Sequence, residues 1–122
     1  MSRFFLISGS LSAFMAVAMG AFGAHGLSQK LSPESLGVFE VGARYQMYHA
    51  IALLVVGFAL GRMNRGEFVV AGWCFLVGSI VFSGSLYALS LSGIRWLGAI
   101  TPLGGLAFLL GWLSLAWGSW RA

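Results

Sequence analysis

The chain has 122 residues, of which 59% are hydrophobic and only 8% are charged. A soluble domain carries about a quarter charged residues, so this composition excludes a water-covered surface and predicts an integral membrane protein. The net charge of +4 comes from seven basic and three acidic residues. The basic residues form no patch with interleaved aromatic residues, which argues against nucleic-acid binding. The single cysteine, Cys74, excludes an intramolecular disulfide and a cysteine metal cluster.

The first apolar stretch, residues 4–24, contains no Asp, Glu, Lys or Arg. A helix needs about 20 apolar residues to cross a bilayer, so we expect a first span over residues 4–26. A cleaved signal peptide is the alternative, because Arg3 precedes the apolar core and small residues follow it, but the run is long for a signal peptide. Small residues recur every four positions, a spacing that favours close helix packing. They are Ser8, Ser12, Ala16 and Gly20.

The segment GAFGAHG, residues 20–26, ends this first span. We expect Gly20 and Gly23 to let a neighbouring backbone come close. Gly26 is suited to the left-handed position just past the end of a helix. The segment therefore predicts that His25 is held at the rim of the membrane, at the mouth of a polar layer.

A helix start follows the first span. Ser32 is a typical N-cap residue, Pro33 fits the first helical position, and Glu34 lies at the positive end of the helix dipole. We expect a short interfacial helix to begin at Pro33 over the bilayer surface. It would lead into the second span, residues 43–61, near Gly42.

Two further spans are predicted, at residues 68–91 and 97–119, with polar turns at residues 62–67 and 92–96. In the last span, small residues alternate steps of three and four, which predicts a heptad seam. They are Gly104, Ala107, Gly111, Ser114 and Gly118. We therefore expect an all-α membrane protein, a compact four-transmembrane-helix bundle that forms a single domain over residues 1–122.

Four spans place both termini on one side of the membrane. That side carries Arg3, Arg62, Arg65 and Arg121, whereas the other side carries Lys30, Arg44 and Arg95. The positive-inside rule then favours termini in the cytoplasm.

Polar side chains gather in the outer halves of the predicted spans. A rise of 1.5 Å per residue places His49, Ser85 and Thr101 about 7–10 Å below the outer interface. Polar groups in hydrocarbon cost several kcal/mol unless they are partnered, so we expect these groups to face one another. Glu40 and Arg44 are four residues apart, which predicts an ion pair. The full set is His25, Glu40, Arg44, Tyr45, Tyr48, His49, Ser83, Ser85, Tyr87 and Thr101.

This polar layer has three interpretations. It is a hydrogen-bond network that fixes the bundle, a ligand-binding site, or a catalytic or metal site. Two histidines without a flanking Asp or Cys are a weak metal signal. We therefore expect no catalytic residue, no metal and no cofactor.

Four segments of the sequence resemble those of a known family. The segments are GAFGAHGL (20–27), YQMYHA (45–50), GSIVFSGSLYAL (78–89) and ITPLGGLAFLLGW (100–112). With them the chain resembles the family called domain of unknown function 423, which includes transmembrane protein 256. The resemblance implies a small multi-pass protein of the bacterial inner membrane or, in eukaryotes, of an organelle membrane. It implies no molecular activity.

Three classes of function are consistent with the sequence. The first is a non-enzymatic protein whose outer pocket binds a lipid, quinone or other small amphiphile, or whose surface binds a membrane partner or a second copy. The alternative is a small-molecule or ion transporter acting as an oligomer. Four-span exporters use a carboxylate in their first span, and this chain has none there. The third class is an intramembrane enzyme, or a haem protein that uses His25 and His49.

Overall fold

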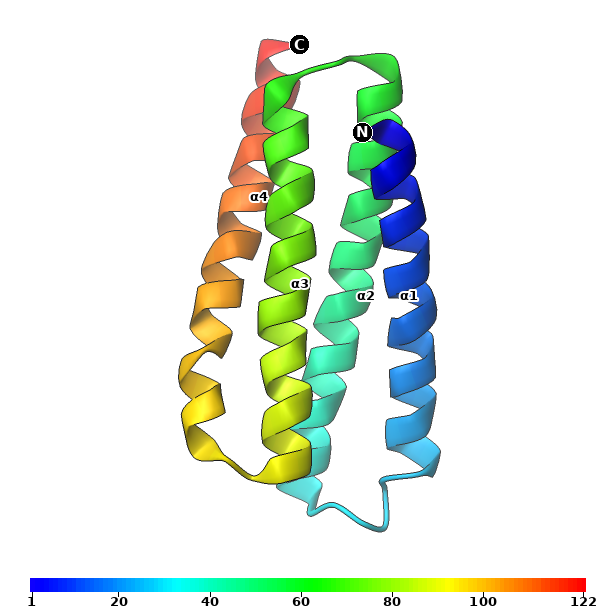
Figure 1. Ribbon diagram of the computed structural model, residues 1–122, viewed down its shortest axis with the longest axis vertical. Helices are drawn as coiled ribbons and strands as arrows, with labels where there is room; N and C mark the ends of the chain where they lie inside the picture. Colours follow the sequence, from blue (N-terminus) through cyan, green and yellow to red (C-terminus); the bar gives the residue numbers. More distant parts are fainter.

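The protein consists of four long helices joined by short connections, as a computed structural model of residues 1–122 shows (Figure 1). Each helix is long and apolar enough to cross a membrane. A short 3-10 helix precedes the last one and continues into it. The elements are α1 (Ser2–His25), α2 (Pro33–Arg62), α3 (Gly66–Ser92), η1 (Arg95–Ala99) and α4 (Thr101–Arg121).

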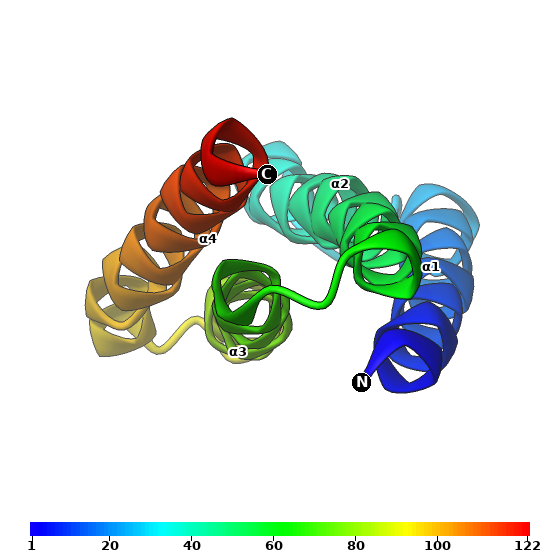
Figure 2. The same ribbon diagram turned by 90° about the horizontal axis from the view of Figure 1, so that it is seen from above.

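Extensive contacts join consecutive helices only: α1 packs on α2, α2 on α3, and α3 on α4. Seen from above, α1 and α4 lie at the two edges of the molecule and do not close a ring (Figure 2). The bundle is therefore open and flattened where we expected a compact one. Both termini and the α2–α3 turn lie at one end (Figure 1). The 26–32 connection and the α3–η1 turn lie at the other.

The helix start predicted at Pro33 is present, because the Ser35 amide donates a 3.1 Å hydrogen bond to the Ser32 hydroxyl. The separate interfacial helix is wrong. From Pro33 the chain runs as one helix of 30 residues to Arg62. No proline interrupts this run after Pro33. A helix of this length extends about 45 Å, which exceeds the roughly 30 Å thickness of the hydrocarbon layer.

The small-residue stripe predicted on α1 is confirmed at Ala16, which is buried, and at Ser12, which accepts hydrogen bonds from Gln46 of α2, but not at its two ends. The residues of α1 that are buried are Phe5, Gly9, Ala16 and Gly23, so Ser8 and Gly20 lie off the contact line. A Cβ on Gly9 would lie 2.9 Å from the Ala50 carbonyl oxygen, whereas one on Gly20 would meet nothing within 4 Å. The close backbone contact between α1 and α2 is therefore made at Gly9.

The end of α1 also differs from the prediction. Gly26 has φ −89°, a right-handed value, and its amide bonds the Phe22 carbonyl at 2.6 Å. The Leu27 amide donates a hydrogen bond to the same carbonyl at 3.1 Å, so the backbone stays right-handed through the last turn of the helix. The glycine with a left-handed backbone is Gly93, with φ 74°, at the end of α3.

The glycine seam predicted on α4 is confirmed at three positions. Gly104, Gly111 and Gly118 are buried against α3 and lie seven residues apart. A Cβ at these positions would lie 2.5 Å from the Phe82 nitrogen, 2.7 Å from the Phe75 ring and 2.8 Å from Glu67 Cβ, respectively. These glycines therefore let α4 approach α3 closely, and they orient the rest of α4 toward the site described next.

Candidate functional site

His49 lies buried on α2 and holds a partner at each ring nitrogen. Its Nδ1 lies 2.8 Å from the Tyr45 carbonyl oxygen, and its Nε2 lies 3.1 Å from the indole Nε1 of Trp112 on α4. A carbonyl accepts only and an indole N–H donates only, so Nδ1 carries the hydrogen and Nε2 accepts. The imidazole is therefore the neutral Nδ1–H tautomer, and neither nitrogen is free for a further partner.

The rings around His49 come from three helices, and those on α2 and α4 have the same spacing. Tyr45 and His49 are four residues apart on α2, and Phe108 and Trp112 are four apart on α4, so each pair shares one helix face. The His49 ring stacks on the Phe108 ring with centroids 3.5 Å apart and planes 4° apart. Phe82 of α3 packs against Tyr45 and Phe108 with centroids 5.1 and 5.3 Å apart. These rings form one aromatic wall.

This wall borders the largest cavity in the protein, about 740 Å³, between α2 and α4. No charged residue lines it, and most of its lining is apolar, which differs from the polar pocket expected from the sequence. The hydroxyls of Tyr45 and Tyr48 make no hydrogen bond within the protein, and both side chains are exposed. The lining residues are Tyr45, Tyr48, His49, Phe82, Pro102, Gly105, Leu106, Phe108, Leu109 and Trp112. We call this space the aromatic cavity.

Ser85 and Thr101, two further predicted residues, bond to each other beside this cavity, where α4 begins. Their hydroxyl oxygens lie 2.6 Å apart, which ties α3 to the start of α4. The Ser85 hydroxyl also donates to the Phe82 carbonyl at 2.9 Å. Because Ser85 has one hydroxyl hydrogen, Thr101 is the donor in the shared bond. This pair connects two helices, and the hydroxyl hydrogens of both residues are already used in hydrogen bonds within the protein.

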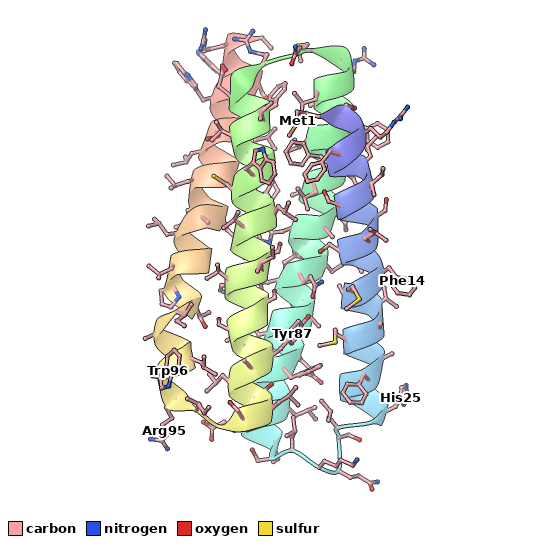
Figure 3. The ribbon with its side chains drawn as sticks, viewed as in Figure 1. Met1, Phe14, His25, Tyr87, Arg95 and Trp96 are labelled. Carbon is pink, nitrogen blue, oxygen red and sulfur yellow. The ribbon has the colours of Figure 1, made fainter.

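Ser83 and Tyr87 belong to a different group, on the α1 side of the α2–α3 pair. Ser83 Oγ donates to the Gly42 carbonyl at 2.7 Å. The Tyr87 hydroxyl donates to Gln46 Oε1 at 2.6 Å, and Gln46 Nε2 reaches the Ser12 carbonyl at 3.2 Å. Tyr87 lies toward the end of the bundle opposite the termini (Figure 3). The predicted single polar layer is therefore divided into two groups that face different sides.

Three predicted residues lie outside both groups. His25 is exposed at the end of α1 and points away from the other helices (Figure 3). Glu40 and Arg44 are exposed, and the predicted ion pair between them is wrong. The ion pairs lie at the other end of the bundle around Glu67, which is 3.1 Å from Arg121 and 3.9 Å from Arg65.

The common depth predicted for His49, Ser85 and Thr101 is also wrong. His49 bonds Trp112, which lies eleven residues beyond Thr101 and so about 16 Å further along α4. Ser85 alone shares the level of Thr101. His49 is therefore buried near the middle of the bundle, and the structure does not bring it together with His25.

Sequence reasoning missed Gln46, Phe108 and Trp112. Gln46 gave a usable signal, because it is the only side-chain amide within the four long helices. Trp112 gave a second one, since it is the tryptophan farthest from the ends of its helix and so falls outside any interfacial belt. Phe108 gave no signal, because one phenylalanine among many apolar residues is indistinguishable from a lipid-facing one.

Fold and site together define a small membrane protein with four helices able to span the bilayer and an aromatic cavity between the second and fourth. The chain belongs to the family described as "Protein of unknown function (DUF423)", whose model matches residues 19–105. This family is the one that the sequence segments resemble.

Similar proteins cover almost the whole chain. It is 49% identical over 119 residues to a UPF0382 membrane protein of Staphylococcus saprophyticus, with 98% of each chain covered. It is 46% identical to the UPF0382 membrane protein YwdK of Bacillus subtilis, with 93% of each covered. A UPF0382 membrane protein of Haemophilus influenzae is 45% identical, with 93% of this chain and 90% of that one covered. No solved structure matches this chain significantly.

Proposed function

We propose that this protein is a non-enzymatic protein of the cell inner membrane that binds an uncharged, lipid-soluble amphiphile in the aromatic cavity. The carrying observation is a cavity of about 740 Å³ whose lining contains no charged residue. Its volume falls in the range of roughly 300–1,000 Å³ that is typical of small-molecule sites. An uncharged guest from the surrounding lipid loses no ionic hydration on entering it.

The residues that line the cavity favour a ligand with an apolar ring or acyl chain and an oxygen that accepts a hydrogen bond. The rings of Phe82, Phe108 and Trp112 offer apolar faces on which a ring or an acyl chain can pack. The hydroxyls of Tyr45 and Tyr48 have no partner in the protein and can donate to an oxygen of the guest.

The same geometry argues for binding rather than catalysis or transport. Both ring nitrogens of His49 are bonded, so the one histidine at the cavity has no free position for proton transfer. No carboxylate lines the cavity to couple a solute to protons. We therefore favour a binding protein over a small-molecule or ion transporter that acts as an oligomer.

Filling the cavity tests this function. Gly105 lines it, and the nearest atoms to a Cβ there are 3.9 Å away on Phe82, so Gly105→Phe places a ring in the space. Leu110→Phe, on the exposed face of α4, is the matched control. Thermal unfolding is measured in nanodiscs with decylubiquinone, dodecanol and dodecyl phosphate. At a free concentration about 100 times Kd, a bound probe stabilises the folded state by about 2.7 kcal/mol.

We expect decylubiquinone or dodecanol to raise the Tm of the wild type and of Leu110→Phe, but not that of Gly105→Phe. Dodecyl phosphate, whose charge has no counterpart in the cavity, should give no shift. Equal shifts in Gly105→Phe and the wild type, or no shift with either uncharged probe, would exclude the proposed function.

A further inference from the structure

A second cavity, of about 350 Å³, lies on the α1 side of the α2–α3 pair and shares no lining residue with the aromatic cavity. We call it the hydroxyl cavity. No charged residue lines it. A Cβ on Gly84, one of its lining residues, would meet no atom within 4 Å, so the space beside this glycine is empty of protein. Its polar lining residues, from three helices, are Ser12, Gln46, Ser79, Ser83 and Tyr87.

The polar groups of this cavity have hydrogen-bonding capacity left over. Tyr87 donates to Gln46, and Gln46 donates to the carbonyl and, at 3.4 Å, to the hydroxyl oxygen of Ser12. Ser83 donates to the Gly42 carbonyl. These bonds leave the hydroxyl hydrogen of Ser12 and lone pairs on the oxygens of Tyr87 and Ser83 without a partner. The lining therefore offers donors and acceptors at once.

Ser79 adds the clearest sign of a missing partner. It is only 7% exposed, and its buried hydroxyl makes no hydrogen bond. A buried hydroxyl without a partner destabilises a protein, and lipid supplies none. Ser79 lines the cavity, and its hydroxyl can move among three staggered positions about the Cα–Cβ bond. Five other helical serines bond back to a carbonyl of their own helix, namely Ser8, Ser10, Ser85, Ser90 and Ser92.

We propose that the hydroxyl cavity binds an uncharged hydroxyl group, supplied by a water molecule or by the alcohol of a neutral lipid such as a diglyceride. A hydroxyl both donates and accepts, which matches the mixed lining. An ester carbonyl only accepts, so it would leave the lone pairs of Tyr87 and Ser83 unpaired. An ionic head group would find no counter-charge there.

Three variants distinguish the loss of binding at this site from the general effect of a substitution on stability. Ser79→Ala removes the unpartnered hydroxyl. Gly84→Leu is designed to fill the cavity, because Gly84 lines it and the added Cβ would meet no atom within 4 Å. Ser90→Ala is the matched control, because Ser90 is on the same helix, is 4% exposed, and bonds only the Tyr87 carbonyl of its own helix.

The first measurement detects water. Water-edited solid-state NMR on 13C-serine-labelled protein in lipid bilayers records magnetisation transfer from water to each serine Cβ, and the Ser79 signal is assigned by its loss in Ser79→Ala. If water is the guest, transfer to Ser79 in the wild type should exceed transfer to Ser79 in Gly84→Leu several-fold.

The second measurement detects a lipid alcohol. Thermal unfolding in nanodiscs is compared with dioctanoylglycerol, which has one free hydroxyl, and with trioctanoylglycerol, which has none. If a lipid alcohol is the guest, the diglyceride should raise the Tm of the wild type and of Ser90→Ala by several degrees more than the triglyceride does. The difference should shrink in Ser79→Ala and vanish in Gly84→Leu.

Either effect, lost in Gly84→Leu and kept in Ser90→Ala, supports the proposal and identifies the source of the hydroxyl. Absence of both effects in the wild type, or their persistence in Gly84→Leu, overturns it. Gly105→Phe, which blocks the aromatic cavity, should leave both effects in place, so this test is independent of the proposed function.

Discussion

The indole Nε1–H of Trp112 donates a 3.1 Å hydrogen bond to Nε2 of His49, and this bond joins α4 directly to α2. The stacked rings of His49 and Phe108 are a second direct contact, whereas extensive backbone packing links the two helices only through α3. The bond fixes the imidazole in its Nδ1–H tautomer and joins two residues that line the aromatic cavity. His49 is therefore held against α4 by a hydrogen bond and by a stacked ring, both within the lining of the cavity.

Trp112→Phe should destabilise the protein by about 1–3 kcal/mol, because it leaves the Nε2 acceptor of His49 buried without a donor. Trp117→Phe, at an exposed position with no hydrogen bond, is the control and should be neutral. The measurement is the free energy of unfolding in detergent. In the double variant with His49→Leu, the losses should fall short of their sum by about 0.5–3 kcal/mol, and strictly additive losses would contradict a direct bond.

Gly104→Ala should loosen α4 from α3, because the added Cβ would lie 2.5 Å from the Phe82 backbone nitrogen, which no side-chain rotation can relieve. Overpacking of this kind costs about 1–3 kcal/mol. Gly105→Ala is the control one residue away, where the nearest atoms to the Cβ are at 3.9 Å. Thermal unfolding should show a lower Tm for Gly104→Ala alone, and similar Tm values for the two variants would refute the close contact.

Gly9→Ala and Gly20→Ala distinguish the observed α1–α2 contact from the stripe predicted by the sequence. A Cβ on Gly9 would lie 2.9 Å from the Ala50 carbonyl, so Gly9→Ala should cost about 1–3 kcal/mol. Gly20→Ala meets no atom and should be neutral or stabilise by up to about 1 kcal/mol through helix propensity. Chemical denaturation in detergent measures both, and the reverse order of stabilities would restore the predicted stripe.

The proposed orientation places both termini in the cytoplasm. Lys30 and Asn64 are exposed at opposite ends of the bundle, so Lys30→Cys and Asn64→Cys report on opposite sides of the membrane. In a Cys74→Ala background, a membrane-impermeant maleimide should label Lys30→Cys in intact cells. Asn64→Cys should be labelled only after lysis. The opposite pattern would reverse the orientation.

Much of the fold could be read from local features of the sequence. The four apolar stretches, the N-cap at Ser32 and the glycine seam at Gly104, Gly111 and Gly118 each depend on residues that are near one another in the chain. Helix propensity, capping and heptad spacing act over one or two turns. For these features, the chain itself carries all the information that is needed.

Only the tertiary structure decided the site. The relative rotation and axial shift of the helices determine that His49 meets Trp112 and not Ser85, and that Gln46 meets Tyr87. Both depend on close contacts such as Gly9 against Ala50, which no residue spacing reveals. The composition determined that the protein lies in a membrane, and local sequence patterns determined where its helices begin and end. Packing between segments that are distant in the sequence determined which polar side chains face one another.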